Sequence, residues 1–233
     1  MSKGGVIAIV SGGLDSVSMA YLLADDGYEV SLISFDYGQR HRKEIDFAAI
    51  CAQRLSADHR IVDLRVLTSL MNTSSLTSEL IDVPDGHYAE DSMKQTVVPN
   101  RNAIMINIAT ALAVTKGSKF IATGVHGGDH FIYPDCRPEF ILSQSQTLKL
   151  ANSGFIDQKF EILAPFVNKS KADIVALGES IGVPWLETWS CYKGGDIHCG
   201  SCGTCFERRE AFEIASVTDP TNYATRPVFT DPR

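Results

Sequence analysis

Ser11-Gly12-Gly13-Leu14-Asp15-Ser16 is the stretch that decides the fold, because it joins an apolar run at residues 6–10 to a segment with helical spacing. A strand that ends in small residues and turns into a helix presents unpaired backbone N–H groups at the positive end of a helix dipole. Glycines allow an anion to approach closely, and serine hydroxyls add hydrogen-bond donors. The sequence therefore predicts a phosphate-binding loop, whose residues are Val10, Ser11, Gly12, Gly13, Leu14 and Ser16.

Asp15 is the unusual residue of this loop, because a carboxylate repels bare phosphate. It indicates either a helix cap or a magnesium ion that inverts the local charge. The loop lacks the Gly-Lys-Ser/Thr ending of a Walker A motif and the Gly-x-Gly-x-x-Gly of a dinucleotide fingerprint. From these residues alone, an ordinary glycine-rich turn is the alternative.

The hexapeptide at residues 11–16 resembles the pyrophosphate loop (PP loop) of the ATP pyrophosphatases. Members of this group activate a substrate oxygen by transferring AMP to it and releasing pyrophosphate. The resemblance implies an adenine nucleotide alpha hydrolase-like fold, with ATP as a substrate and Mg²⁺ beside it.

A second motif lies near the other end of the sequence, where four cysteines have the spacing Cys-x7-Cys-x2-Cys-x2-Cys. Four thiolates among several glycines suit a closed, tetrahedral structural zinc site. Two disulfides are disfavoured because no secretory signal is visible, and a [4Fe–4S] cluster is the stronger rival to zinc. We expect one structural zinc ion per chain, held by Cys191, Cys199, Cys202 and Cys205.

Short apolar or β-branched segments alternate with segments of helical periodicity, and this pattern is typical of a doubly wound parallel sheet. The expected strands are residues 6–10, 29–35, 60–63, 120–123 and 161–164, and the expected helices are residues 16–24, 43–55, 101–115 and 171–181. We predict an α/β fold with a five-stranded sheet. Residues 1–185 would form the nucleotide-binding domain, and residues 186–233 a zinc-binding segment packed on it.

The composition is that of a cytoplasmic enzyme with one sizeable core: 233 residues, 44% hydrophobic, with a formal net charge of −7. The acidic balance argues against nonspecific binding to nucleic acid. No apolar run approaches the ~20 residues of a membrane span. We therefore expect neither a nucleic-acid nor a membrane partner.

Ligands of doubly wound sheets bind beyond the carboxyl ends of the strands, so the residues that follow strands are candidates for the site. Arg40 and His41 follow the second expected strand and are placed to reach phosphate or adenine, although a solvated polar loop is equally consistent. Arg101 opens an apolar helix, where it opposes the helix dipole unless an anion is near. A surface arginine paired with an acid is the alternative. Lys171 begins another expected helix and could touch the same phosphates.

The segment after the fourth expected strand is rich in histidine, carboxylate, glycine and proline, which suit a recognition loop better than a core. We therefore expect a substrate-binding loop that contains Asp129, Asp135 and Arg137.

Taken together, the segments at residues 11–16, 36–41, 98–102 and 133–137 and the four late cysteines resemble one branch of the ATP pyrophosphatases, the branch that serves queuosine biosynthesis. The resemblance implies an ATP-dependent C–N ligase that converts 7-carboxy-7-deazaguanine and ammonia to the 7-cyano product (preQ0) through adenylated intermediates. It assigns the catalytic roles to Asp15, Arg101 and Lys171, and it suggests a homodimer. The guanine-like edge of such a substrate has adjacent N–H donors and would need a carboxylate acceptor, which Asp129 or Asp135 would supply.

Two alternatives stay open from the residues. The first is another adenylating enzyme of this group that acts on tRNA, although such thiolases need a catalytic cysteine pair outside the metal site. The second is a zinc-ribbon adaptor for nucleic acid with an inactive nucleotide site, which the acidic net charge disfavours.

Overall fold

The centre of the molecule is β1 (Gly5–Ile9), the middle strand of a five-stranded sheet in the computed structural model of the protein. The structure describes residues 2–39, 42–70, 73–78, 80–86 and 91–227. The strand order is β3-β2-β1-β4-β5 and every pairing is parallel. The other strands are β2 (Glu29–Asp36), β3 (Asp58–Asp63), β4 (Phe120–Ala122) and β5 (Glu161–Leu163). The predicted five-stranded parallel sheet is confirmed.

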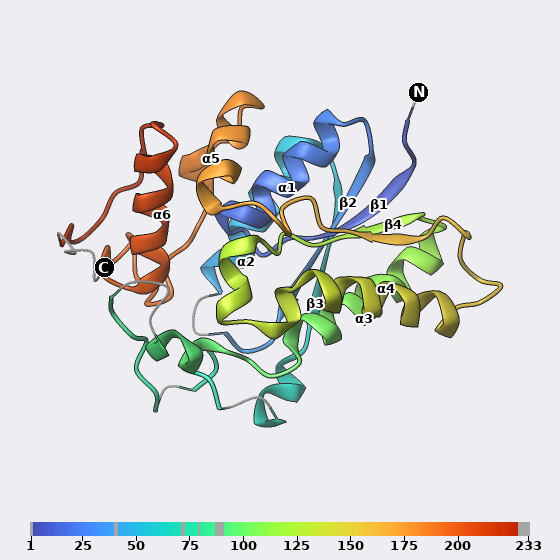
Figure 1. Ribbon diagram of the computed structural model, residues 1–233, viewed down its shortest axis with the longest axis horizontal. Coiled ribbons are helices and arrows are strands. Elements are labelled where there is room, and N and C mark those ends of the chain that lie inside the picture. The colour runs from blue at the N-terminus through green and yellow to red at the C-terminus, as the bar shows by residue number, and fades with distance from the viewer. Residues whose placement is uncertain (1, 40–41, 71–72, 79, 87–90, 228–233) are drawn as a thin grey trace.

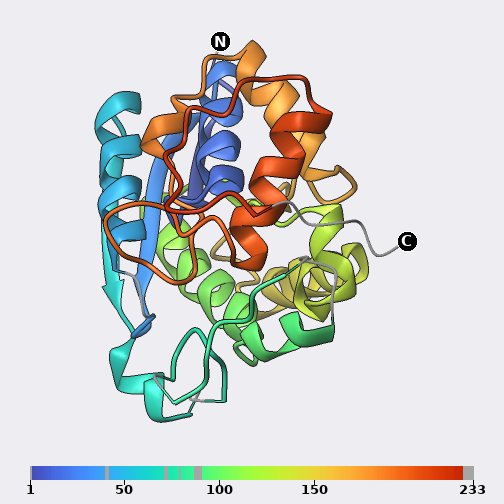
Figure 2. The ribbon, with the colours of Figure 1, turned by 90° about the vertical axis from the view of Figure 1, so that its left-hand side faces the viewer.

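Helices cover both faces of the sheet (Figures 1 and 2). One face carries α1 (Leu14–Asp25), α2 (Lys43–Leu55), α5 (Lys171–Ser180) and α6 (Gly203–Ile214). The other carries α3 (Arg101–Lys116) and α4 (Pro138–Ala151). Four of these six helices match the sequence expectation, and the expectation missed α4 and α6. Short 3₁₀ helices span Arg65–Leu70, Asp91–Thr96, Gly127–Phe131, Pro134–Cys136 and Trp185–Glu187.

The side chains of β1 alternate between two apolar cores, as expected of a strand buried on both faces. Val6 and Ala8 join the core beneath α1 and α5, whereas Ile7 joins the core beneath α3. All three are fully buried. Burial of each large aliphatic side chain contributes roughly 1.5–3 kcal/mol. This double packing fixes β1, and with it the loop that follows it.

Within the described residues, the stretch Met93–Lys116 has the length and composition of a membrane span. It consists of the 3₁₀ helix Asp91–Thr96 and α3, separated by Asn100 in the left-handed conformation at φ 61°. α3 itself has 16 residues, fewer than the ~20 that a span needs. Ile106 and Ala113 of α3 are buried in the core under the sheet. We therefore interpret α3 as a core helix, and its apolar composition as the consequence of that packing.

The cysteine-bearing part of the chain adds a third, small core of Val83, Trp189, Cys191, Cys202 and Cys205. The helix that follows, α6, contributes Ala211 and Phe212 to the core shared with α1 and α5. Phe212 packs edge to face with Trp185, with ring centroids 5.2 Å apart. Apolar contacts thus tie the C-terminal segment to the face of the sheet that carries α1 and α5.

Candidate active site

The loop between β1 and α1 has the strand-turn-helix geometry that the sequence predicted. Gly12 adopts φ 93°, and a Cβ at this position would lie 2.0 Å from the backbone oxygen of Glu44. The hydroxyl of Ser16 accepts a hydrogen bond from the N–H of Ser11 at 3.2 Å and donates one to the oxygen of Gly13 at 3.1 Å. Only glycine satisfies both the backbone angle and the close approach at position 12. The loop is therefore held in one shape with its free N–H groups at the start of α1.

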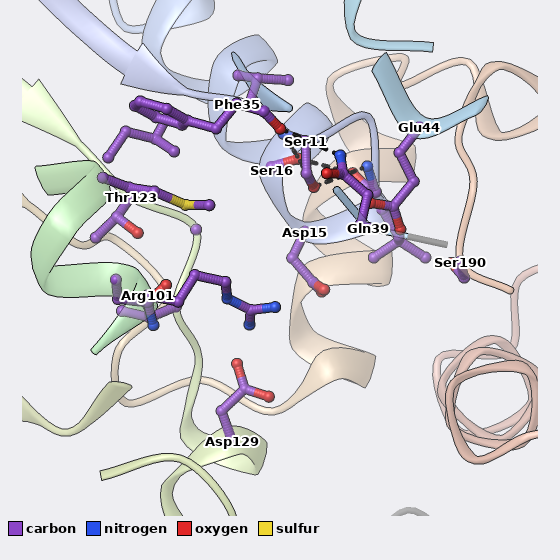
Figure 3. Close-up of a pocket in the computed structure, with 18 of the residues that line it drawn as sticks. Ser11, Asp15, Ser16, Phe35, Gln39, Glu44, Arg101, Thr123, Asp129 and Ser190 are labelled. Carbon is purple, nitrogen blue, oxygen red and sulfur yellow. Dashed lines mark hydrogen bonds between the residues drawn. The ribbon is translucent and has the colours of Figure 1, made fainter. Parts of the chain in front are cut away.

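The loop opens onto a cavity of about 230 Å³ at the carboxyl ends of β1, β2 and β4 (Figure 3). This is the position that the topology of an open parallel sheet favours for a ligand. Of the expected site residues, the cavity wall includes Val10, Ser11, Gly13, Leu14, Asp15, Ser16, Arg101, Asp129 and Lys171. Segments that lie far apart in the sequence therefore meet in one place.

Asp15 and Lys171 meet at the floor of this cavity. The Nζ of Lys171 lies 3.3 Å from Oδ2 of Asp15 and 2.5 Å from Oε2 of Glu207. Burial opposes the charged form of Lys171, but the carboxylates of Asp15, Glu207 and Asp129 outweigh burial and hold the pKa of the lysine above its usual value. The Oδ1 atom of Asp15 is buried without a hydrogen-bond partner in the described part of the chain.

His126, which the sequence reasoning did not select, joins the same cluster. It is 1% exposed, and its Nδ1 accepts a hydrogen bond from the N–H of Gly128 at 3.1 Å. Because Nδ1 accepts, the ring proton of the neutral tautomer sits on Nε2, which lies 3.5 Å from Oδ2 of Asp129. His126 therefore orients a carboxylate of the cavity wall.

Arg101 extends from the first turn of α3 into the cavity (Figure 3). It donates a hydrogen bond to the hydroxyl of Tyr37 at 3.2 Å, and its guanidinium lies over the rings of Tyr37 and Tyr133. Burial raises the pKa of the Tyr37 phenol, so that hydroxyl stays neutral. Within the described residues, no carboxylate forms an ion pair with Arg101, so the alternative of an arginine paired with an acid is not what the structure shows.

Glu44 is a second residue that the sequence reasoning missed. It stands in the first turn of α2 and its side chain lines the cavity beside the loop (Figure 3). Burial raises the pKa of its carboxyl to about 7. The cavity thus contains an acid that changes its charge near neutral pH.

Asp135 and Arg137 lie outside the cavity wall, in contrast to the expectation that they contact substrate. Oδ2 of Asp135 accepts a hydrogen bond from the N–H of Asn102 at 3.2 Å, where it satisfies an unpaired donor at the start of α3. The Nε of Arg137 donates to the oxygen of His130 at 2.9 Å. Both side chains fix the loop that carries Asp129. Arg40 and His41 lie outside the described residues.

The four cysteines converge, with their sulfur atoms within 4.8 Å of one another. Backbone N–H groups of Ser201 and Cys202 point to the sulfur of Cys199 at 3.4 and 3.3 Å, an arrangement that favours a thiolate. All six cysteines are free thiols in the structure. Four soft sulfur donors at this separation fit a tetrahedral metal ion.

Comparison with solved structures supports the fold. The U34-tRNA thiolase NcsA from Methanococcus maripaludis, solved with its [4Fe-4S] cluster, superposes with a TM-score of 0.50 at 15% identity, over 93% of this chain and 66% of that one. The NMN synthetase from Francisella tularensis superposes with a TM-score of 0.50 at 14% identity, over 93% of this chain and 79% of that one. At these identities the likeness concerns architecture alone.

Comparison of sequences is more specific. A protein of Mesorhizobium japonicum, 7-cyano-7-deazaguanine synthase 1, is 57% identical over 217 residues, which cover 93% of this chain and 92% of that protein. The 7-cyano-7-deazaguanine synthase of Rhizobium meliloti is 58% identical over 93% of this chain and 91% of its own length. Residues 5–216 match the family described as queuosine biosynthesis protein QueC. This chain, with its loop, its five-stranded sheet and its late cysteines, belongs to the QueC family.

Proposed function

We propose that this protein is an ATP-dependent C–N ligase that makes 7-cyano-7-deazaguanine from 7-carboxy-7-deazaguanine and ammonia. The observation that carries the proposal is the convergence, in one cavity, of the loop after β1, the Asp15–Lys171 pair and the half-buried Arg101. An anion-binding loop beside two cations suits a nucleotide triphosphate. The names of the relatives supply the substrate class.

In the first half of the reaction, the substrate carboxylate oxygen attacks the α-phosphorus of ATP and pyrophosphate leaves. The loop N–H groups and the hydroxyls of Ser11 and Ser16 would hold the departing pyrophosphate. Arg101 and Lys171 would neutralise the charge that develops at the α-phosphate. Ammonia then attacks the acyl carbon and displaces AMP, which leaves a primary amide.

In the second half, the amide oxygen attacks the α-phosphorus of a second ATP, and pyrophosphate leaves again. Loss of AMP and of the two amide N–H protons then forms the C≡N bond. The protein needs no covalent nucleophile for this sequence, because each step consists of positioning and of charge stabilisation. Burial raises the pKa of the Cys136 thiol far above its usual value, in keeping with a cysteine that takes no part as a nucleophile.

The carboxylates at the floor of the cavity are suitable ligands for a magnesium ion. The unpartnered Oδ1 of Asp15 is a hard oxygen donor aimed at the space where the phosphates would lie, and Asp129 faces the same space. Bound Mg²⁺ would supply charge neutralisation of the phosphates. Asp129 is also the remaining candidate for the base edge, because Asp135 is engaged with α3.

We further propose that the four cysteines bind one structural zinc ion and that residues 186–233 form the zinc-binding segment. Four thiolates leave no open position, so the ion would stabilise the fold and perform no chemistry. We expect a cytoplasmic homodimer. Size-exclusion chromatography with light scattering tests the oligomeric state.

The deciding experiment is incubation of the purified protein with ATP, Mg²⁺, ammonium and 7-carboxy-7-deazaguanine, followed by mass spectrometry. We expect the amide and then the nitrile, with pyrophosphate released only when the deazaguanine is present. Pyrophosphate release with neither product, or no release at all, would overturn the proposal.

A further inference from the structure

Glu207 is the residue that joins the cysteine cluster to the floor of the cavity. It stands in the second turn of α6, and its carboxylate accepts a hydrogen bond from Lys171 of α5 at 2.5 Å. The side chains of both residues are 10% exposed. A charge-assisted hydrogen bond between two buried groups of opposite charge is stronger and geometrically tighter than one on the surface.

The cysteine cluster determines where Glu207 stands. Cys202 is the N-cap of α6, and Cys205 lies in its first turn. Both belong to the group of four cysteines whose sulfurs converge within 4.8 Å. Because an α-helix is a rigid unit over two turns, fixing its first turn fixes the direction of the side chain that follows.

Lys171 needs this support because of where it stands. It is the first residue of α5, where the positive end of the helix dipole repels an ammonium group. Asp15, another carboxylate beside it, also faces the phosphate space. Glu207 therefore allows Lys171 to keep its place and charge when Asp15 engages another cation.

We propose that Glu207 is a positioning residue that holds Lys171 toward the phosphate space and thereby couples the metal-binding cluster to the nucleotide site. The inference rests on the function proposed above. It means that the metal ion would influence turnover as well as stability, through α6 and a single carboxylate.

The test compares three variants of the full chain. Glu207→Gln keeps the shape and removes the charge, Glu207→Asp keeps the charge on a shorter stem, and Glu213→Gln alters an exposed glutamate of the same helix. We expect Glu207→Gln to lower kcat by about 10–100-fold, with KM for the deazaguanine unchanged, because Lys171 would act in the transition state. Glu207→Asp should recover part of the rate, and Glu213→Gln should match the unmodified protein.

A second readout needs no turnover. Labelling of lysines with an amine-reactive reagent, followed by peptide mass spectrometry, reports the fraction of each amine that is uncharged. In Glu207→Gln the labelling rate of Lys171 should rise about tenfold for each unit by which its pKa falls. The exposed Lys169 should label at an unchanged rate and serves as the internal control. Metal content and melting temperature of each variant are measured in parallel.

The outcomes separate the two proposals. If the unmodified protein forms no amide or nitrile, the proposed function fails, and the labelling still decides the role of Glu207. Unchanged labelling of Lys171 together with unchanged kcat in Glu207→Gln would overturn the positioning role. A rise in KM with unchanged kcat, or equal losses in Glu207→Gln and Glu213→Gln, would also overturn it.

Discussion

Lys171 and Asp15 each stand in the first turn of a helix, and their Nζ and Oδ2 atoms lie 3.3 Å apart. The N-termini of α1 and α5 therefore converge on one point of the cavity. Each contributes the positive end of a helix dipole. The lysine adds a full positive charge between the carboxylates of Asp15 and Glu207. This arrangement leads to the first prediction.

Asp15→Asn should lower kcat by about a hundredfold or more while changing the melting temperature little. The amide keeps the shape of the side chain but loses the charge that faces Lys171 and the proposed magnesium ion. Steady-state release of pyrophosphate measures the effect. Asp25→Asn, at the exposed end of the same helix, is the matched control. A kcat for Asp15→Asn equal to that of the control would contradict the role of Asp15.

Arg101→Lys should lower kcat/KM by about 10–100-fold, because an ammonium group cannot reproduce the planar, multiple donors of a guanidinium. The variant would also lack the contacts that the guanidinium of Arg101 makes over the rings of Tyr37 and Tyr133. The exposed Arg54, paired with Glu187 on the surface, offers Arg54→Lys as the control. Equal kcat/KM values for the two variants would show that Arg101 is an ordinary core arginine.

Gly12→Ala should destabilise the protein by about 2–4 kcal/mol, since a methyl group at φ 93° would lie 2.0 Å from the backbone oxygen of Glu44. Gly13→Ala is the natural comparison. Gly13 has φ −74°, and a methyl group there would meet only the hydroxyl of Ser11, at 3.3 Å, and the oxygen of Trp189, at 3.5 Å. Denaturant unfolding of both variants measures the difference. If Gly13→Ala proved the more costly, the described shape of the loop would be wrong.

The Cys202→Ser variant should fail to bind the metal ion and should unfold or precipitate, because metal binding and folding are coupled at such a site. The sulfur of Cys202 is buried in the small core beside Trp189, so a serine there also buries a hydroxyl. Elemental analysis of the unmodified protein should give one zinc per chain. Iron in place of zinc would support the cluster alternative, and a soluble, fully active Cys202→Ser would refute the structural role.

Glu44→Gln should change how stability depends on pH. The carboxyl has a pKa of about 7 in the folded protein and 4.5 as its ordinary value. Between these values the folded state holds a proton that the unfolded state has lost, so the free energy of unfolding falls as pH rises from about 4.5 to 7. Glutamine carries no charge and escapes this loss. The free energy of unfolding of Glu44→Gln, relative to that of the unmodified protein, should therefore increase by about 2 kcal/mol between pH 4.5 and pH 7. This value is smaller than the pKa difference alone would give, because solvent reaches the cavity.

Thermal unfolding of Glu44→Gln and of the unmodified protein at several pH values measures this effect. Glu29→Gln, at the exposed start of β2, is the control and should run parallel to the unmodified protein. A constant offset between Glu44→Gln and the unmodified protein across this range would contradict the raised pKa.

The sequence predicted those parts of the fold that depend on interactions between residues close together in the chain. The apolar runs of the five strands and the glycines of the PP loop act through neighbouring residues, so their pattern predicted both sheet and loop. It failed for α4, which begins at Pro138 directly after a loop rich in turn-forming residues. It failed for α6 because the cysteine spacing predicted the metal site and left the helix around it unmarked.

The sequence reasoning selected candidate site residues at the ends of strands and helices. It missed residues that only the tertiary structure brings together. Glu207 follows a cysteine by two positions, and nothing in that spacing indicates that it meets Lys171. His126 reads as one polar residue among several in a loop, although it is almost completely buried. Asp135, a carboxylate that looked suited to a ligand, accepts a hydrogen bond from the start of α3, a contact that the sequence alone did not indicate.

The central place of β1 has a consequence for synthesis of the chain. On the ribosome β1 and β2 are available to pair early, but β4, which covers the other edge of β1, follows only after residue 120. Until then the nascent polypeptide exposes an apolar strand edge, which is prone to aberrant pairing with other chains. Substitutions that slow docking of β4 should therefore reduce the yield of soluble protein in cells more than they reduce the stability of molecules that have already matured.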